Sequence, residues 1–429
     1  MANSLTQLKE LELTCSGKDV RVLKNFTQLT RLRLNIWPNK RLNKRLNKLF
    51  RENPKFSKNL TRLGFEFGIA TLSNLDGVFQ SSTDLEEFNL RCGSIETLNG
   101  LENLVKLKTL GVDFEDKSDV YLVGPAVLKK LSNLGDLRFG LSQIDISLSP
   151  TSATDLALIF GRLESLSVEV WGFLELQNLN GILPFCTNLR KLSIEFDNDD
   201  DVDDSTTMIT SETGRLIGKM DLEEFNLNNE YPSISNQFHQ FQNVNVGKVI
   251  IPASNWNRLS KLSILFQVLD EASLRKIGND YVLLKDLSIS IGSVCDPKDL
   301  SEVIPFLTKL KKLERLSLRM ERMANREIQI EDHRILFSAF NAVFPLDVDG
   351  DSLSVFPHMK RFQAYLSSVS FRYTLQKTCL GEVKRYLQLK RAIHRTYEQY
   401  NTSNVYQKYE TYEIKPKDIV LDTIPHYDD

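Results

Sequence analysis

A frame of three apolar residues recurs twelve times along this 429-residue sequence. The spacing is L-x-x-L-x-L, with Phe, Val or Ile replacing some leucines, as in Leu107, Leu110 and Val112. A helix alone does not produce this spacing, because its apolar residues recur every three to four positions, and a strand requires two throughout. The recurrence therefore indicates a repeat architecture. The frames begin at Leu8, Leu29, Leu60, Leu85, Leu107, Leu134, Leu163, Leu189, Leu222, Leu259, Leu284 and Leu313.

The period of the repeat defines its class. From Leu8 to Leu313 the eleven intervals average about 28 residues, shorter than the periods of helical repeats. We expect each L-x-L to be a short strand with both apolar side chains inward, and the first leucine to close the preceding turn. Intervening stretches such as 123–134 and 270–284 have helical spacing. Such strand–helix units bury their apolar faces only when stacked, which predicts a curved α/β solenoid with strands concave and helices convex.

These frames resemble the leucine-rich-repeat superfamily, in its longer, ribonuclease-inhibitor-like subtype with helical convex segments. The resemblance covers roughly residues 5–340. The sequence mostly lacks the Asn that regularly follows the third apolar residue in that family, and the stretches 32–36 and 225–229 come closest. The intervals vary from 21 to 37 residues, which indicates an irregular solenoid of a kind common in protist proteomes.

Charge and hydropathy limit the possible classes of partner and the expected cellular location. Lys and Arg number 54 against 56 for Asp and Glu, so no global field attracts nucleic acid or anionic membranes. No apolar run is long enough to span a bilayer, and the first residues lack the pattern of a signal or transit peptide. We expect no membrane insertion and a cytoplasmic location.

Chemical motifs are hard to find in this sequence. The five cysteines, odd in number and far apart, show no metal or redox spacing, and the histidines are scattered. The stretch 195–212 is rich in aspartate but lacks the Gly and Glu of a calcium loop, so we interpret it as a solvated loop. The segment 214–219 departs from a phosphate-binding loop and is expected to be helical. We therefore predict no enzyme activity, cofactor, metal site or small-molecule substrate.

The concave face is predicted from strand periodicity, because the residues between and after the last two apolar positions point away from the core. No basic stripe runs along these positions, which makes nucleic acid an unlikely partner. The middle is mildly acidic, so a basic partner segment can bind there, or the mixed charge simply keeps the face soluble. The pairs are Glu12/Thr14, Arg33/Asn35, Gly64/Glu66, Asn89/Arg91, Gly111/Asp113, Arg138/Gly140, Ser167/Glu169, Ser193/Glu195, Asn226/Asn228, Ser263/Leu265, Ser288/Ser290 and Ser317/Arg319.

The C-terminal part differs from the repeats and divides the chain into three regions: a solenoid over 1–373, a basic amphipathic helix over 374–400 and an extended Tyr-rich tail over 401–429. The helix is predicted from the near-helical spacing of its apolar residues among many basic ones. Aromatic residues in an otherwise patternless tail are typical of an anchor that orders on binding. The tail either docks on a partner or folds back on its own solenoid.

The predicted function is a non-catalytic scaffold for protein–protein interaction, a structural subunit of a larger assembly whose other protein subunits are its partners. The alternative is a substrate-recognition adaptor or an enzyme regulator that binds its target in the concave face, as the namesake of the resembled family does. The residues expected to bind partners are Tyr406, Tyr409, Tyr412, Lys384, Arg385, Arg391, Glu169 and Glu195.

Overall fold

The chain forms two compact units in a computed structural model, an N-terminal unit over Met1–Glu195 and a C-terminal unit over Phe196–Asp429. The structure describes residues 7–16, 19–37, 42–114, 124–140, 153–170, 173–196, 210–228, 250, 253, 255–266, 271–291, 305–320, 358–366, 369–377, 383–393 and 408–409.

The N-terminal unit is built on a sheet whose strands follow one another in chain order. Neighbouring strands pair in parallel from the first to the seventh of them. A second, two-stranded parallel sheet joins β4 (Thr71–Leu72) to β6 (Ser94–Ile95). The strands of the main sheet are β1 (Glu10–Ser16), β2 (Arg31–Trp37), β3 (Arg62–Glu66), β5 (Glu87–Cys92), β7 (Thr109–Phe114), β8 (Asp136–Gly140), β9 (Ser165–Val170) and β10 (Lys191–Phe196).

The C-terminal unit continues the pattern and then changes direction. Five strands pair in parallel, namely β11 (Glu224–Asn228), β12 (Lys261–Phe266), β13 (Asp286–Ile291), β14 (Arg315–Met320) and β15 (Arg361–Leu366). Three antiparallel strands follow, namely β16 (Val369–Lys377), β17 (Val383–Ile393) and β18 (Lys408–Tyr409).

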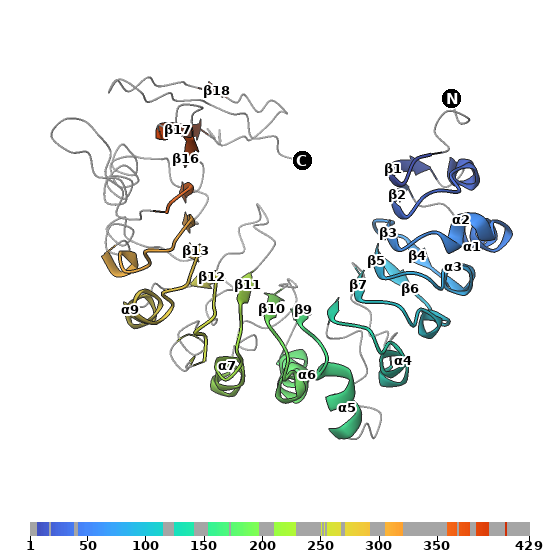
Figure 1. Ribbon diagram of the computed structural model, residues 1–429, viewed down its shortest axis with the longest axis horizontal. Helices are drawn as coiled ribbons and strands as arrows, with labels where there is room; N and C mark the ends of the chain where they lie inside the picture. Colours follow the sequence, from blue (N-terminus) through green and yellow to red (C-terminus); the bar gives the residue numbers. More distant parts are fainter. Residues whose placement is uncertain are drawn as a thin grey trace, which may run out of the picture. The chain divides into compact units, whose positions relative to one another are not determined.

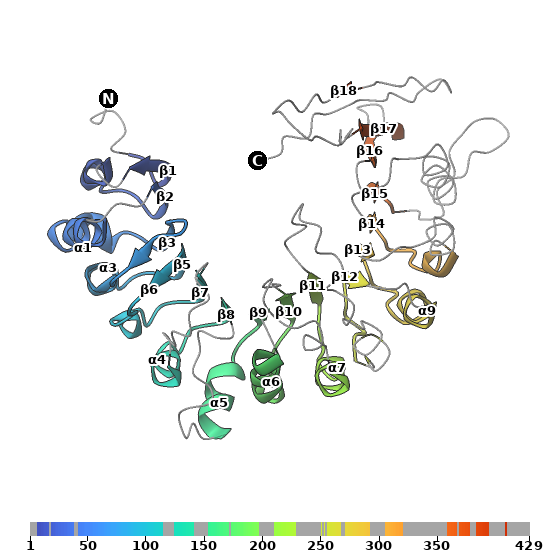
Figure 2. The same ribbon diagram turned by 180° about the vertical axis from the view of Figure 1, so that it is seen from behind.

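The helices of each unit lie on one side of its strands (Figure 1), and the view from behind shows the same layering (Figure 2). We call the opposite side of the sheet, which carries no described helix, the open face. The helical segments are η2 (Asp19–Asn25), α1 (Leu42–Glu52), α2 (Pro54–Lys58), α3 (Asp76–Ser81), η3 (Leu101–Asn103), α4 (Pro125–Lys130), α5 (Ala153–Phe160), α6 (Phe173–Ile182), η5 (Leu183–Phe185), α7 (Ser211–Gly218) and α9 (Glu271–Asp280).

Most frames of the sequence form the same local structure. In ten of the twelve frames the amide of the first leucine donates to the carbonyl three residues earlier, as Leu107 does to Leu104 at 2.9 Å, so this leucine closes the turn as predicted. The next residues form the strand, and its first amide donates to the residue just before the preceding strand, as Arg31 N does to the Lys9 carbonyl at 3.0 Å. The predicted helices at 123–134 and 270–284 are present as α4 and α9.

The core lies between the sheet and the helices and consists of the apolar residues of the frames. From β2 onward the two inward residues of each described L-x-L are buried, and Leu32, Leu63, Phe88 and Leu110 follow one another in register. Burying such a side chain contributes about 1.5–3 kcal/mol relative to leaving it exposed. Adjacent strands thus stabilise each other through continuous rows of apolar contacts.

Aromatic rings connect the helical layer to the sheet. In the N-terminal unit Phe65 of β3 lies edge-on to Phe50 of α1 at 6.3 Å and to Phe88 of β5 at 6.2 Å between ring centroids. In the C-terminal unit Trp256 contacts Tyr281 at 5.6 Å, and its indole nitrogen donates to the Ile217 carbonyl at 3.3 Å. The polar N–H group of Trp256 therefore has a hydrogen-bond partner inside the core.

The predicted helix over 374–400 is wrong where the structure describes this region, because residues 383–393 form strand β17. Apolar residues at Val383, Leu387, Leu389 and Ile393 also fit a period of two, so the sequence was compatible with either structure. The preceding strand decides the outcome, since β16 offers β17 nine paired positions and satisfies its backbone hydrogen bonds.

The structure tests the predictions for two other segments and the tail only in part. Residues 214–219 lie largely in α7 and are helical as expected, and Thr210 caps this helix by accepting from the Thr213 amide at 3.1 Å. The aspartate-rich loop lies mostly outside the described residues, as does the tail over 401–429 apart from Lys408–Tyr409.

A charged residue at an inward strand position tests the repeat register. Leu192 of β10 is 2% exposed, so Leu192→Asp buries an uncompensated carboxylate. We expect a loss of about 3–5 kcal/mol in the free energy of unfolding. Amide hydrogen exchange should show β9 and β10 losing protection before distant strands. An exposed residue of the same repeat provides the control, because Thr187→Asp should cost less than about 1 kcal/mol. Wild-type melting of Leu192→Asp would contradict the register.

Candidate interaction face

The open face of the N-terminal unit consists of alternate strand residues, which form rows that cross the strands in register. The second and third rows occupy the positions that the sequence analysis predicted. The second row contains Glu12, Arg33, Gly64, Asn89, Gly111, Arg138 and Ser167. The third row begins Thr14, Asn35, Glu66, Arg91 and Asp113.

A first row, which the sequence analysis missed, lies at the start of the strands. The same period of two, extended one step toward the N-terminal end of each strand, would have found it. This row carries more charge than the second. Its members are Glu10, Arg31, Arg62, Glu87, Thr109, Asp136 and Ser165.

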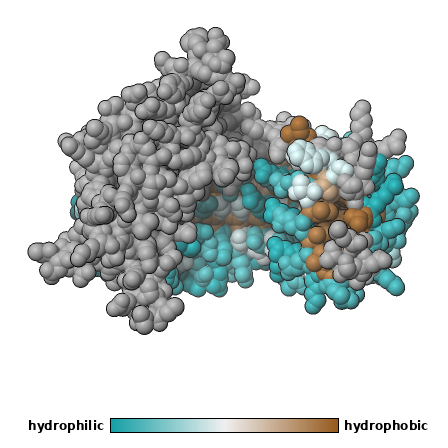
Figure 3. Space-filling view, turned by 90° about the horizontal axis from the view of Figure 1, so that it is seen from above, coloured by the Kyte–Doolittle hydropathy of each residue, from teal (hydrophilic) through white to brown (hydrophobic). Residues whose placement is uncertain are grey.

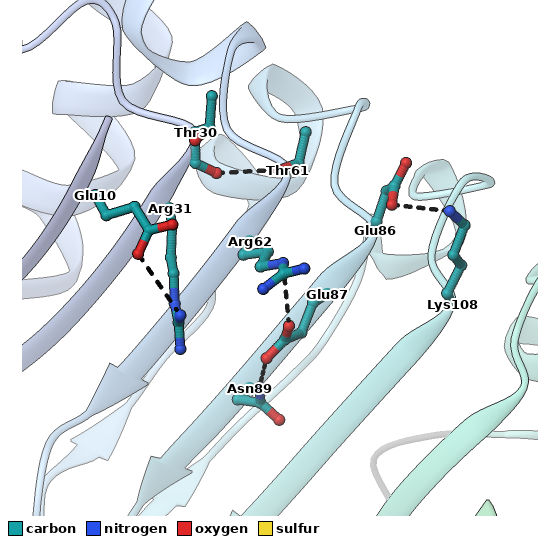
Figure 4. A network of polar contacts seen from close by, with 9 residues as sticks. All are labelled: Glu10, Thr30, Arg31, Thr61, Arg62, Glu86, Glu87, Asn89 and Lys108. Atoms are coloured by element: carbon teal, nitrogen blue, oxygen red, sulfur yellow. Dashed lines mark hydrogen bonds and ion pairs between the residues drawn. The ribbon is translucent and has the colours of Figure 1, made fainter. Parts of the chain in front are cut away.

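Figure 4 shows how the first row is held together. Arg31 lies 3.7 Å from the Glu10 carboxylate, and Arg62 lies 3.7 Å from that of Glu87. Glu87 also accepts a hydrogen bond of 2.9 Å from the Asn89 side-chain amide. Each ion pair joins neighbouring strands, so opposite charges on adjacent repeats face each other across the sheet.

The second and third rows contain similar ion pairs. Arg33 lies between two carboxylates, 3.8 Å from Glu12 and 3.6 Å from Glu66. Arg91 lies 3.5 Å from Asp113. The arginines are about half exposed, and exposed pairs of this length contribute about 1 kcal/mol or less. These side chains are therefore loosely held and can re-pair with an incoming partner at little cost.

Asp136 is a carboxylate of the first row whose pKa is shifted from its ordinary value. Burial raises the pKa of the Asp136 carboxyl, and the nearby Glu87 carboxylate raises it further. A hydrogen bond from Ser165 and the charge of Lys191 oppose this rise. Because desolvation dominates, the ionised form of Asp136 costs stability in the folded chain.

The two carboxylates that the sequence analysis selected on this face lie on β9 and β10, toward the opposite end of the strands from Asp136. Glu169 stands beside Gly140 in register. The Glu195 carboxylate lies 3.4 Å from the guanidinium of Arg138, reaching from β10 to β8, and is 14% exposed. The structure thus pairs Glu195 with Arg138, a contact that the sequence analysis did not predict. This pairing neutralises part of the acidic charge in the middle of the face.

The selected residues of the C-terminal part lie on the antiparallel strands or outside the described residues. Lys384 and Arg385 lie opposite Gln376 and Leu375, and Arg391 lies opposite Val369. Tyr409 of β18 is paired with Ala392 of β17, so this part of the tail folds back on the chain itself. Tyr406 and Tyr412 lie outside the described residues.

The open face of the C-terminal unit has a different chemistry. Its second row is uncharged and consists of Asn226, Ser263, Ser288 and Ser317 in register. Charge lies mainly in the first row, where Arg315 lies 2.7 Å from Asp286. The third row adds Arg319, which stands beside Ser290 in register. The N-terminal face therefore carries charge in all three rows, whereas the second row of the C-terminal face consists of small hydroxyl and amide groups.

The described residues contain no cluster of three or more His, Cys, Asp or Glu side chains that could hold a metal ion. Cys15, Cys92 and Cys186 are free thiols, and burial raises the pKa of Cys186 to about 12, which suppresses its reactivity. Among the helices that the structure describes, none is long and apolar enough to cross a membrane.

The stacked parallel strands, the L-x-x-L-x-L frame in register and the helices on one side are the features of the leucine-rich-repeat fold. No protein-family model matches the sequence, and no curated protein matches it. Solved structures of other proteins are similar to this chain at low sequence identity.

Two of the similar structures are internalins from Listeria monocytogenes. Internalin inlF is 16% identical, with 85% of this chain and 88% of that chain covered and a TM-score of 0.40. Internalin C2 is 16% identical, with 59% and 94% covered and a TM-score of 0.33. The third is the yeast Rad7 and Elc1 complex, 15% identical, with 74% and 81% covered and a TM-score of 0.42.

The cost of the Asp136 charge can be measured by removing it. Because burial raises the pKa of the Asp136 carboxyl above its ordinary value, stability falls as the pH rises from that ordinary pKa through the raised one, and the cost is complete at neutral pH. We expect Asp136→Asn to raise the melting temperature at about pH 7, and the gain to shrink toward about pH 4. Circular dichroism measures both.

A matched variant separates this effect from a general loss of negative charge. Asp113→Asn removes a carboxylate that is paired with Arg91, so it should leave stability unchanged or slightly lower. Equal stabilisation by both variants would show that the desolvation of Asp136 is not the cause.

Proposed function

We propose that this chain is a non-catalytic protein–protein interaction scaffold, a structural subunit of a larger assembly. The observation that carries the proposal is the unlike chemistry of its two open faces. Glu10, Arg33 and Arg91 belong to a face of alternating charges, whereas Ser263 and Ser288 belong to an uncharged row. Two surfaces of different chemistry suit two different partners, which is what a scaffold requires.

The size of the N-terminal open face supports this proposal. Eight strands at a spacing of about 4.8 Å extend for about 38 Å, and strands of about five residues are about 17 Å long. The footprint is on the order of 600 Å², comparable with the roughly 800 Å² that each partner buries in a stable complex. Its charges are loosely paired, so a partner with complementary charges can replace these contacts.

A second candidate is an adaptor or regulator that holds one target on the N-terminal open face. The observation that favours it is Asp136, a carboxylate whose ionised form is disfavoured by burial and which lies on the same face as Glu169 and Glu195. Groups kept charged at a cost to stability cluster at binding sites. A basic segment of a target would relieve this cost.

Two sets of variants distinguish the candidates in affinity capture of the tagged full chain, with bound proteins identified by mass spectrometry. For the scaffold we expect the Ala variant of Tyr406, Tyr409 and Tyr412 to lose its assembly, because aromatic rings dominate binding where they are buried. The Phe variant of the same three residues keeps the rings and should retain it. Lys384, Arg385 and Arg391 are proposed to assist through charge.

The open face is tested in the same experiment by Glu169→Lys with Glu195→Lys. If the chain is a scaffold anchored by its tail, this charge reversal should weaken capture less than loss of the tyrosine rings does. The reverse order, in which charge reversal abolishes capture and the Ala variant is harmless, would exclude the tail-anchored scaffold and favour the adaptor or regulator.

A further inference from the structure

The first strand of the N-terminal unit, β1, has an apolar row that is only partly covered. Its inward residues Leu11 and Leu13 are half-buried, whereas Leu32 and Leu34, their partners in β2, are 1% and 0% exposed. Val22 of η2, which packs against β1, is also exposed. Seen from above, apolar surface gathers on the end of this unit (Figure 3). One more layer of chain would bury this surface.

The backbone of β1 is also open on this side. Lys9 accepts from the Arg31 amide, and in a parallel pair every second residue directs its amide and carbonyl to the same neighbour. Lys9, Leu11 and Leu13 therefore face β2, and the peptide groups of Glu10, Glu12 and Thr14 face outward. Among the described strands, none pairs with β1 on that side. Such an edge is a template for an added strand.

The charges on β1 define which strand would fit. Glu10 and Glu12 are 68% and 73% exposed, and their described ion pairs reach only toward β2, at 3.7 Å to Arg31 and 3.8 Å to Arg33. In the adjacent strands the same alternation continues, because Arg33 has a carboxylate on both sides. An added strand that continued it would place basic side chains opposite Glu10 and Glu12 and apolar ones opposite Leu11 and Leu13.

An exposed aromatic residue lies at the same corner of the sheet. Trp37 stands beside Ser16 in register, on the row of the open face nearest the carboxyl ends of the strands, and is 71% exposed. Large exposed aromatic residues are frequent anchors in protein interfaces. A strand added along β1 would lie two strand spacings, about 9.6 Å, from β2, so its side chains on the open face could approach this ring.

We propose that the outer edge of β1 is a strand-addition site for an extended segment of a partner protein in which basic and apolar residues alternate. This inference rests on the proposed scaffold function and names the chemistry of one partner segment. A second copy of the chain fits less well, because antiparallel pairing of two β1 strands would bring four glutamates together without adding a cation.

Peptide titration of the purified full chain tests the proposal. The probe is a seven-residue peptide of alternating arginine and valine, matching the seven residues of β1. Two controls are a peptide of the same composition with the arginines grouped, and one with glutamate in place of arginine. We expect only the alternating peptide to bind, with a change in tryptophan fluorescence that Trp37→Phe abolishes. Equal binding of the grouped peptide would overturn the proposal in favour of non-specific charge attraction.

Two pairs of variants separate the backbone and charge contributions. Thr14→Pro removes an outward amide without breaking a bond to β2 and should abolish peptide binding, while Thr14→Ala should bind like wild type. Glu10→Lys with Glu12→Lys should reduce affinity at least about tenfold, whereas Glu102→Lys, on η3 and away from this edge, should not. The melting curve of each variant shows whether it is folded. Unchanged binding by folded Thr14→Pro would exclude strand addition.

Sedimentation equilibrium of the chain without peptide tests the competing occupant. We expect a monomer over the concentrations used for titration. A dimer that Thr14→Pro converts to a monomer would show that a second copy occupies the edge and would overturn the choice of a basic partner. Failure of peptide binding with normal capture of the assembly would overturn the strand-addition site alone, whereas loss of the scaffold function is read only from the capture experiment.

Discussion

The burial of the leucine rows between the sheet and the helices is the interaction on which every other feature depends. Leu32, Leu63 and Phe88 show the principle, because each is covered by its neighbours in the adjacent strands and by the helical layer. A single repeat exposes these residues, so its strand is stable only when stacked. The same burial sets the register, since a shift by one residue would turn every leucine toward solvent.

This register in turn builds the open face. With the leucines inward, the intervening residues are aligned in rows, and the charge of each row member meets that of the next strand. Arg33 between Glu12 and Glu66 illustrates the result, a cation shared by two neighbouring repeats. These contacts are too exposed to stabilise the fold much. Their importance lies in recognition, because they hold an ordered pattern of charge that a partner can match.

The ends of a repeat array face a problem that its middle does not. An interior strand has neighbours on both sides, but Leu11 and Leu13 of β1 have a described strand on one side only and remain half-buried. At the other end of the C-terminal unit, antiparallel strands β16 and β17 follow the last parallel strand and cover its edge. Covering an edge with antiparallel strands satisfies backbone groups that would otherwise invite another chain.

The sequence by itself determined the repeat, the positions of the strands and turns, and the second and third rows of the open face. These follow from local geometry, because alternation along a strand and closure of a turn involve only nearby residues, as at Leu107, Leu110 and Val112. The first row follows the same rule and was within reach of the sequence, although it was not found there.

Only the tertiary structure decided how these elements affect one another. The pKa of Asp136 depends on its burial and on side chains from three other strands, and the approach of Arg138 to Glu195 crosses a whole strand. Residues 383–393 form a strand because β16 supplies hydrogen bonds that a helix at this place would have to provide itself. The apolar pattern of a segment determines which local structures are open to it. Burial and strand pairing depend on residues that are distant in the chain, and a single sequence does not show where those residues lie.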